Sequence, residues 1–149
     1  MTPKKKRPVA RQPLPGKQKT PRVSQCEHCG YPDSSRPVWL LGVLDMEGRW
    51  GWSRINRGLF ETVHERLRNF ETMTWTAIQQ GDSHFVPCSD IIKDARDRLA
   101  EIEQDDIDDL FSLRVQGRIR VWGIRDGAAL KLLWLDPEHE VCPSLKKNT

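Results

Sequence analysis

The sequence predicts an α+β domain in which two helices pack on an antiparallel sheet, with the elements in the order β-α-α-β-β-β. Apolar residues recur at steps of three and four between residues 60 and 102, as in amphipathic helices. From residue 111 onward they alternate with polar residues, as in strands. Turn signals at Gly117 and Asp126-Gly127 divide this last part into three short strands.

The first strand is predicted over residues 38–44, where Pro37 precedes the apolar run Val-Trp-Leu-Leu-Gly-Val-Leu. The first helix follows, because one face carries regularly spaced apolar residues: Phe60, Val63, Leu67 and Phe70. Thr74 is suited to cap a further turn or two over residues 75–80, which end at Gly81. Because the run over residues 38–44 is apolar at successive positions, we expect that first strand to be buried on both faces.

The second helix is predicted to follow a loop over residues 82–87, with Ser89 as its N-cap. Its apolar stripe consists of Ile92, Ala95, Leu99 and Ile102. Six acidic residues between 101 and 109 lack the glycine and the regular ligand spacing of a calcium loop. We interpret them as a solvated connector to the strands.

The three-strand meander ends with residues 130–135, which are apolar on both faces and are therefore predicted to form a central strand. Pro137 ends this strand. The residues that follow it are unusually rich in ionisable groups, which indicates either a chemical site or a solvated tail.

The basic residues are concentrated at the N-terminal end of the chain. The net charge is +3, yet residues 1–22 hold eight of the 24 basic residues, five of the ten prolines and no acid. The rest of the chain therefore has 16 basic against 21 acidic residues. We predict a disordered basic tail over residues 1–22, a cysteine-containing linker or knuckle over 23–37 and the folded domain over 38–149.

No apolar run has the length of a signal peptide or of a membrane span, which predicts a cytoplasmic protein that does not associate with membranes. The basic run of residues 3–9 is also typical of a nuclear-import signal. A tail that binds nucleic acid or another anionic surface is the alternative interpretation.

Cys26-Glu-His-Cys29-Gly has the CxxC turn of a zinc knuckle, so Cys26 and Cys29 are candidate ligands of a structural zinc ion. A complete site needs four ligands, and the remaining candidates are single residues: Cys88, Cys142, His28, His84 and His139. A turn without metal is the alternative.

The element order resembles that of the RelE/ParE-like toxins of bacterial toxin–antitoxin systems. The resemblance covers roughly residues 38–142 and is strongest in residues 110–127, "LFSLRVQGRIRVWGIRDG", where two arginine-bearing strands flank a turn. It implies a β-α-α-β-β-β core whose last strands carry the working residues. Members of this family cleave messenger RNA, free or on the ribosome, poison gyrase or have no known activity. The resemblance therefore implies RNA or the ribosome as a target and a cognate antitoxin as a possible partner. Many cleaving members use a tyrosine on the sheet, whereas the single tyrosine here, Tyr31, lies outside the meander.

Metal-independent RNA cleavage needs a base near the 2′-hydroxyl, an acid near the leaving oxygen and cations around the phosphorane. We predict His139, His84 and Arg120 as catalytic residues, with no cofactor required. The predicted nucleic-acid-binding residues are all cationic: Arg114, Arg118, Arg125, Lys131, Lys146 and Lys147. The alternative is a non-catalytic module whose cationic sheet binds nucleic acid, an acidic partner or a host factor.

Overall fold

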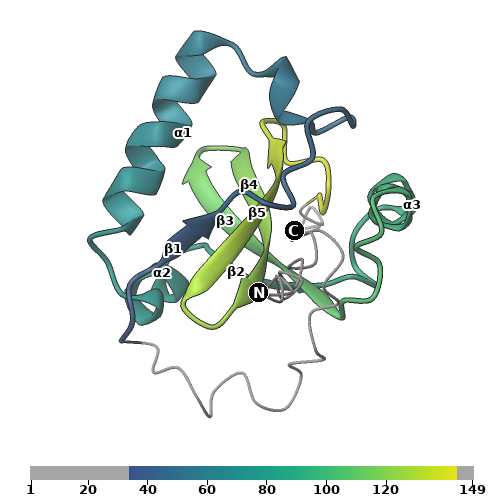
Figure 1. Cartoon of the computed structure of the whole chain (residues 1–149). Coiled ribbons are helices and arrows are strands. Elements are labelled where there is room, and N and C mark those ends of the chain that lie inside the picture. Colours follow the sequence, from purple (N-terminus) through teal and green to yellow (C-terminus); the bar gives the residue numbers. More distant parts are fainter. Residues whose placement is uncertain (1–33, 144–149) are drawn as a thin grey trace, which may run out of the picture.

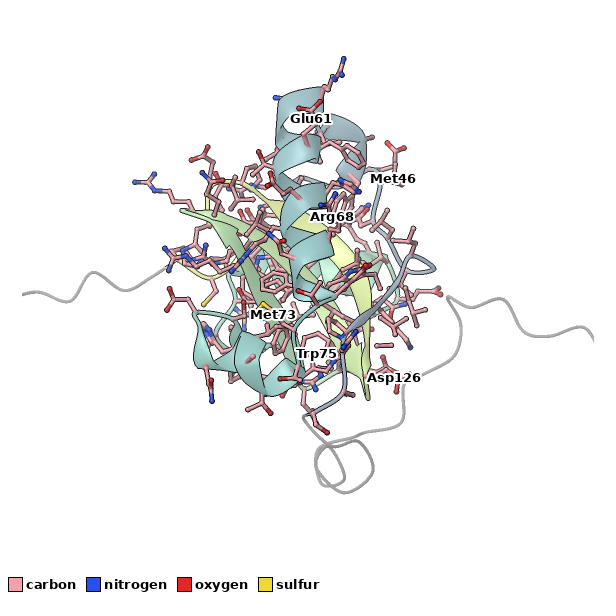
Figure 2. All side chains as sticks on the ribbon, turned by 90° about the vertical axis from the view of Figure 1, so that its left-hand side faces the viewer. Met46, Glu61, Arg68, Met73, Trp75 and Asp126 are labelled. Carbon is pink, nitrogen blue, oxygen red and sulfur yellow. The ribbon has the colours of Figure 1, made fainter. Side chains whose placement is uncertain are left out.

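The computed structural model describes residues 34–143. The predicted tail, the cysteine pair Cys26 and Cys29, and the terminal lysines Lys146 and Lys147 lie outside the described residues. The predicted α+β class is confirmed: a five-stranded sheet has α1 and α2 on one side and α3 on the other (Figure 1). Figure 2 views the molecule from the α1 side, with Trp75 below that helix.

The sheet has the strand order β1-β5-β4-β3-β2. Its strands are β1 (Val38–Leu40), β2 (His84–Pro87), β3 (Asp109–Gln116), β4 (Ile119–Asp126) and β5 (Ala129–Asp136). The β3-β4-β5 meander is antiparallel, as predicted, and β5 lies inside the sheet between β1 and β4. At the bulge between β4 and β5, a Cβ on Gly123 would lie 2.6 Å from the Lys131 carbonyl oxygen, so this position needs glycine.

The described helices are α1 (Arg57–Phe70), α2 (Trp75–Gln80) and α3 (Lys93–Glu101), with a 3₁₀ turn, η2 (Trp52–Arg54), before α1. Thr74 caps α2 as predicted, because its side chain accepts a hydrogen bond from the Ala77 N–H at 3.2 Å. Asn56 caps α1 in the same way through the Leu59 N–H.

Three details of the prediction were wrong. The sheet is mixed rather than antiparallel, because β1 pairs with β5 in parallel. The first strand is shorter than predicted and lies at the sheet edge, which leaves Val38 and Leu40 53% and 41% exposed. Residues 34–143 form three α-helices rather than the predicted two, because α2 is separated from α1 by residues 71–74.

The segment between α2 and α3 also differs from the prediction. Residues 84–87 form β2 instead of a loop, since pairing with β3 stabilises a strand too short to show a clear period. The N-cap position of α3 is Ile92 rather than Ser89. Asp90 lies in the turn before α3, where its N–H donates to the Pro87 carbonyl oxygen at 2.9 Å.

Each face of the sheet buries its own apolar cluster. The face under α1 and α2 packs Phe70, Trp75 and Ile78 against Phe111 and Leu130. The opposite face packs residues of α3 and of the loop before η2 against β4 and β5: Trp50, Ala95, Leu99, Trp122 and Trp134. The candidate site lies on this second face, at its β2 side.

A buried ion pair fixes the loop before η2. The Asp45 carboxylate accepts from Arg98 Nε at 2.9 Å, from Arg98 Nη2 at 2.8 Å and from Trp134 Nε1 at 2.9 Å. These bonds, led by that from Arg98, lower the pKa of Asp45 from 3.8 to about 2 although burial acts in the opposite direction. The pair joins the loop, α3 and β5.

None of the helices in residues 34–143 combines the length and the apolar character needed to cross a membrane.

Candidate active site

A pocket of about 570 Å³ lies on the sheet face opposite α1 and α2. Its lining comes from β2, β3, β4, the loop before α3 and the segment after β5: His84, Val86, Asp90, Ser112, Trp122, His139, Cys142 and Pro143. The two histidines predicted as proton-transfer groups therefore line one pocket although they are far apart in the sequence.

Strand register places the site residues in two rows across the sheet. His84 pairs with Ser112, and Ser112 pairs with Trp122. The neighbouring row pairs Arg114 with Arg120. Because directly opposed residues share a face and the rows are two residues apart, the arginine row lies roughly 7 Å from the histidine row.

His84 enters the pocket from the edge strand β2. Its Nδ1 lies 3.1 Å from the carbonyl oxygen of Asp82, which can only accept a hydrogen bond. Nδ1 therefore carries a proton, and in the neutral ring Nε2 is left as the acceptor.

His139 lies in a turn held by Asp136, which is fully buried at the end of β5. The Asp136 carboxylate accepts from the N–H groups of Glu140 and Val141, both at 2.9 Å, and from Trp122 Nε1 at 3.2 Å. The turn requires a φ of 57° at His139, a left-handed conformation that few residues other than glycine adopt. Asp136 thus positions the histidine without lining the pocket.

The environment of His139 favours its neutral form. Burial lowers its pKa below the ordinary value of 6.5, and the positive charges of Arg120 and His84 act in the same direction, against the charge of Asp136. A neutral imidazole at neutral pH is suited to accept a proton.

Arg120 is half-buried beside this histidine. Burial, followed by the charge of Arg114, lowers its pKa, but a guanidinium remains cationic at neutral pH. Its Nη1 donates to the carbonyl oxygens of Gly117 at 2.6 Å and Ile119 at 3.2 Å, which hold the side chain in place. Arg120 thus provides a fixed positive charge next to the histidines.

The other predicted cations are placed differently. Arg114 is ion-paired with Asp82, and Arg118, 80% exposed in the turn before β4, lies 4.0 Å from Glu138. Arg125 is on the α1 and α2 face, 4.0 Å from the centre of the Trp75 ring, so the structure does not bring it to the pocket. Lys131 lies opposite Ile124, near the far end of the meander, 3.9 Å from Asp126.

The two described cysteines are free thiols. Burial raises the pKa of Cys88 to about 11, with help from Asp109 and Asp108, and burial also raises the pKa of Cys142. Both are therefore protonated at neutral pH and unsuited to act as nucleophiles. Within residues 34–143 no three His, Cys, Asp or Glu side chains gather in a way that could hold a metal ion.

Six residues of the site were not predicted from the sequence: Val86, Asp90, Ser112, Trp122, Asp136 and Pro143. Ser112 lies two residues before Arg114, and Trp122 lies two residues after Arg120. The period of two in a strand therefore predicts that each shares a face with its neighbouring arginine. Asp90 and Asp136 act through contacts between distant segments, for which the sequence gives no signal.

Comparisons of the chain with protein-family models, with curated proteins and with solved structures found no match. The chemistry of the pocket is therefore the basis for a function.

Proposed function

We propose that the protein is a metal-independent endoribonuclease. The observation that carries the proposal is that His84 and His139, from separate segments, line one pocket next to the opposed pair Arg114 and Arg120. Two imidazoles and a cationic wall supply the base, the acid and the charge that cleavage by a neighbouring 2′-hydroxyl requires.

In this mechanism neutral His139 accepts the proton of the 2′-hydroxyl while the 2′-oxygen forms a bond to phosphorus. The bond from phosphorus to the 5′-oxygen breaks, and protonated His84 gives its proton to that oxygen. Arg120 and Arg114 donate to the non-bridging oxygens, whose negative charge grows in the transition state. The products are a 2′,3′-cyclic phosphate and a 5′-hydroxyl.

The mechanism predicts cleavage that needs the 2′-hydroxyl and no metal. Short RNAs incubated with the protein in excess EDTA should be cut and should end in a cyclic phosphate, as measured by mass spectrometry. An RNA with a single 2′-deoxynucleotide at the scissile position should remain intact there and be cut elsewhere. Cleavage of that position, or a requirement for added metal, would contradict the mechanism.

The resemblance to RelE/ParE-like toxins extends the proposal to a biological role. In that role the substrate is messenger RNA, free or on the ribosome, an antitoxin is the partner, and expression of the chain arrests bacterial growth. Growth arrest that depends on His139 would support this role.

A non-catalytic binding module is the second candidate. Two of the cations are already next to acids, Arg114 with Asp82 and Arg118 with Glu138, which weakens the local positive potential. In this case the chain binds RNA or an acidic partner and breaks no bond, so RNA affinity without any cleavage in the EDTA assay would favour the module.

Phosphate binding by Arg120 predicts a change in salt dependence. Arg120→Gln should weaken RNA binding and reduce the slope of log affinity against log salt by about one unit, since one fewer counterion is released. Arg125→Gln is the matched control, because Arg125 packs on Trp75 on the other face and its replacement should leave the slope unchanged. Fluorescence anisotropy at several salt concentrations measures both, and equal slopes for the two variants would contradict this assignment.

A further inference from the structure

The pocket is larger than a phosphate group needs. Its volume of about 570 Å³ falls within the range of sites that enclose whole small molecules, roughly 300–1,000 Å³. A phosphate held by Arg120 and the histidines would leave space along β2 for a further part of the same ligand.

Chemical character changes along the pocket in a fixed order. The arginine row lies beside the pocket, the row of His84, Ser112 and Trp122 lines it, and Val86 lines it two residues further along β2. Asp90 follows beyond the end of β2 and still lines the pocket. A nucleotide with its phosphate at the arginine row would therefore have its base between the apolar side chains and the Asp90 carboxylate.

Asp90 is free to bind a ligand. Among residues 34–143 its carboxylate has no ion-pair partner, and the side chain is exposed. Its backbone is held, because the Asp90 N–H donates to Pro87 and the Cys142 thiol donates to the Asp90 carbonyl oxygen at 3.5 Å. The raised pKa of Cys142 keeps this donor protonated at neutral pH.

From this arrangement we infer that the Asp90 end of the pocket is a guanine-binding subsite, an inference that rests on the proposed action on RNA. A carboxylate only accepts hydrogen bonds, and it accepts two side by side. Guanine presents two adjacent donors on its Watson–Crick edge, the ring N1–H and the 2-amino group. Adenine and cytosine present an acceptor nitrogen next to their amino group, and uracil presents one donor between two acceptors, so each of them would face the carboxylate with a repulsive lone pair.

The apolar lining is compatible with a base. Val86, Trp122 and Pro143 line the pocket and offer apolar surface against which a base can pack. Trp122 is itself fully buried, so it forms the floor of the subsite rather than a mobile stacking platform.

The test uses nucleoside 3′-monophosphates, which can bind without being cleaved. Titration calorimetry should show that the full-length protein binds guanosine 3′-monophosphate about tenfold or more tightly than the inosine analogue, which lacks only the 2-amino group. The preference over adenosine 3′-monophosphate should be larger. Asp90→Asn should bring the guanosine and inosine affinities to within about twofold of each other, because the amide accepts at one atom and donates at the other.

Asp106→Asn is the matched control, since it removes the same charge from an exposed position in the connector before β3 and should keep the guanine preference. Equal affinity of the wild type for the three nucleotides, or no binding of any, overturns the guanine subsite. Such a result leaves the proposed function standing if RNA is still cut in EDTA. Guanine-selective binding without any cleavage has the opposite meaning: it supports the subsite and overturns the nuclease.

Discussion

Replacing His139 by alanine is expected to slow RNA cleavage by about a hundredfold or more while leaving RNA affinity nearly unchanged, as for the loss of a general base. The imidazole contributes no net charge to binding at neutral pH, because burial and Arg120 lower its pKa. Single-turnover rates with excess protein measure the chemical step, and anisotropy measures the affinity. His64→Ala on the exposed side of α1 is the control and should keep the full rate.

The pH profile gives a second readout of the same residue. A general base works in its neutral form, so the rate should fall as the pH drops through the pKa of His139, which lies below 6.5. Arg120→Gln removes a positive charge that lowers this pKa, so the acidic limb should move to higher pH in that variant. Full activity of His139→Ala would mean that the segment after β5 is a solvated tail, and the binding module would then be the better description.

The sequence was informative about residues that share a strand. Within each strand the period of two put Arg114 and Arg120 on the face opposite the apolar residues. That these two faces coincide, with the arginines directly opposed, follows from the register of β3 and β4. Applied to the whole of β4, the same period puts Arg125 on the other face, where it packs on Trp75. Arg125 was predicted to bind nucleic acid because of its charge alone. Its position along β4 already indicated the face opposite Arg120.

Relations between segments were harder to predict. The edge strand β2 exists because β3 offers hydrogen-bond partners, and four residues are too few to show a period. The direction of β1 relative to β5 depends on the path of the chain through α1 and α2, which composition does not encode. The role of Asp136 in holding the His139 turn depends on hydrogen bonds to the backbone of a segment that, from its sequence, could equally have been a tail.

The second large effect is expected at Arg98, away from the pocket. Arg98→Ala should lower the free energy of unfolding by about 3 kcal/mol at pH 7, because it leaves the Asp45 carboxylate buried without its ion-pair partner. The side chains of Asp45 and Arg98 are 3% and 24% exposed, so solvent screens this pair only weakly. Arg57→Ala is the control: Arg57 is 92% exposed in its pair with Glu61, and its loss should cost less than about 0.5 kcal/mol.

The difference in unfolding free energy between the wild type and Arg98→Ala should depend on pH. This dependence distinguishes the loss of an ion pair from the loss of packing. In the wild type the pKa of Asp45 is lowered from 3.8 to about 2, so its contacts, led by the hydrogen bond from Arg98, together contribute about 2 kcal/mol above pH 4, and this is lost as the pH falls through 2. In Arg98→Ala the unpaired carboxylate has a raised pKa and is protonated at higher pH, which removes the cost of the buried charge. Urea unfolding between pH 7 and pH 2 should therefore show the two proteins converging as the pH falls. A difference that stays constant over this range would mean that Arg98 stabilises the fold through the packing of its aliphatic stem, and not through its charge.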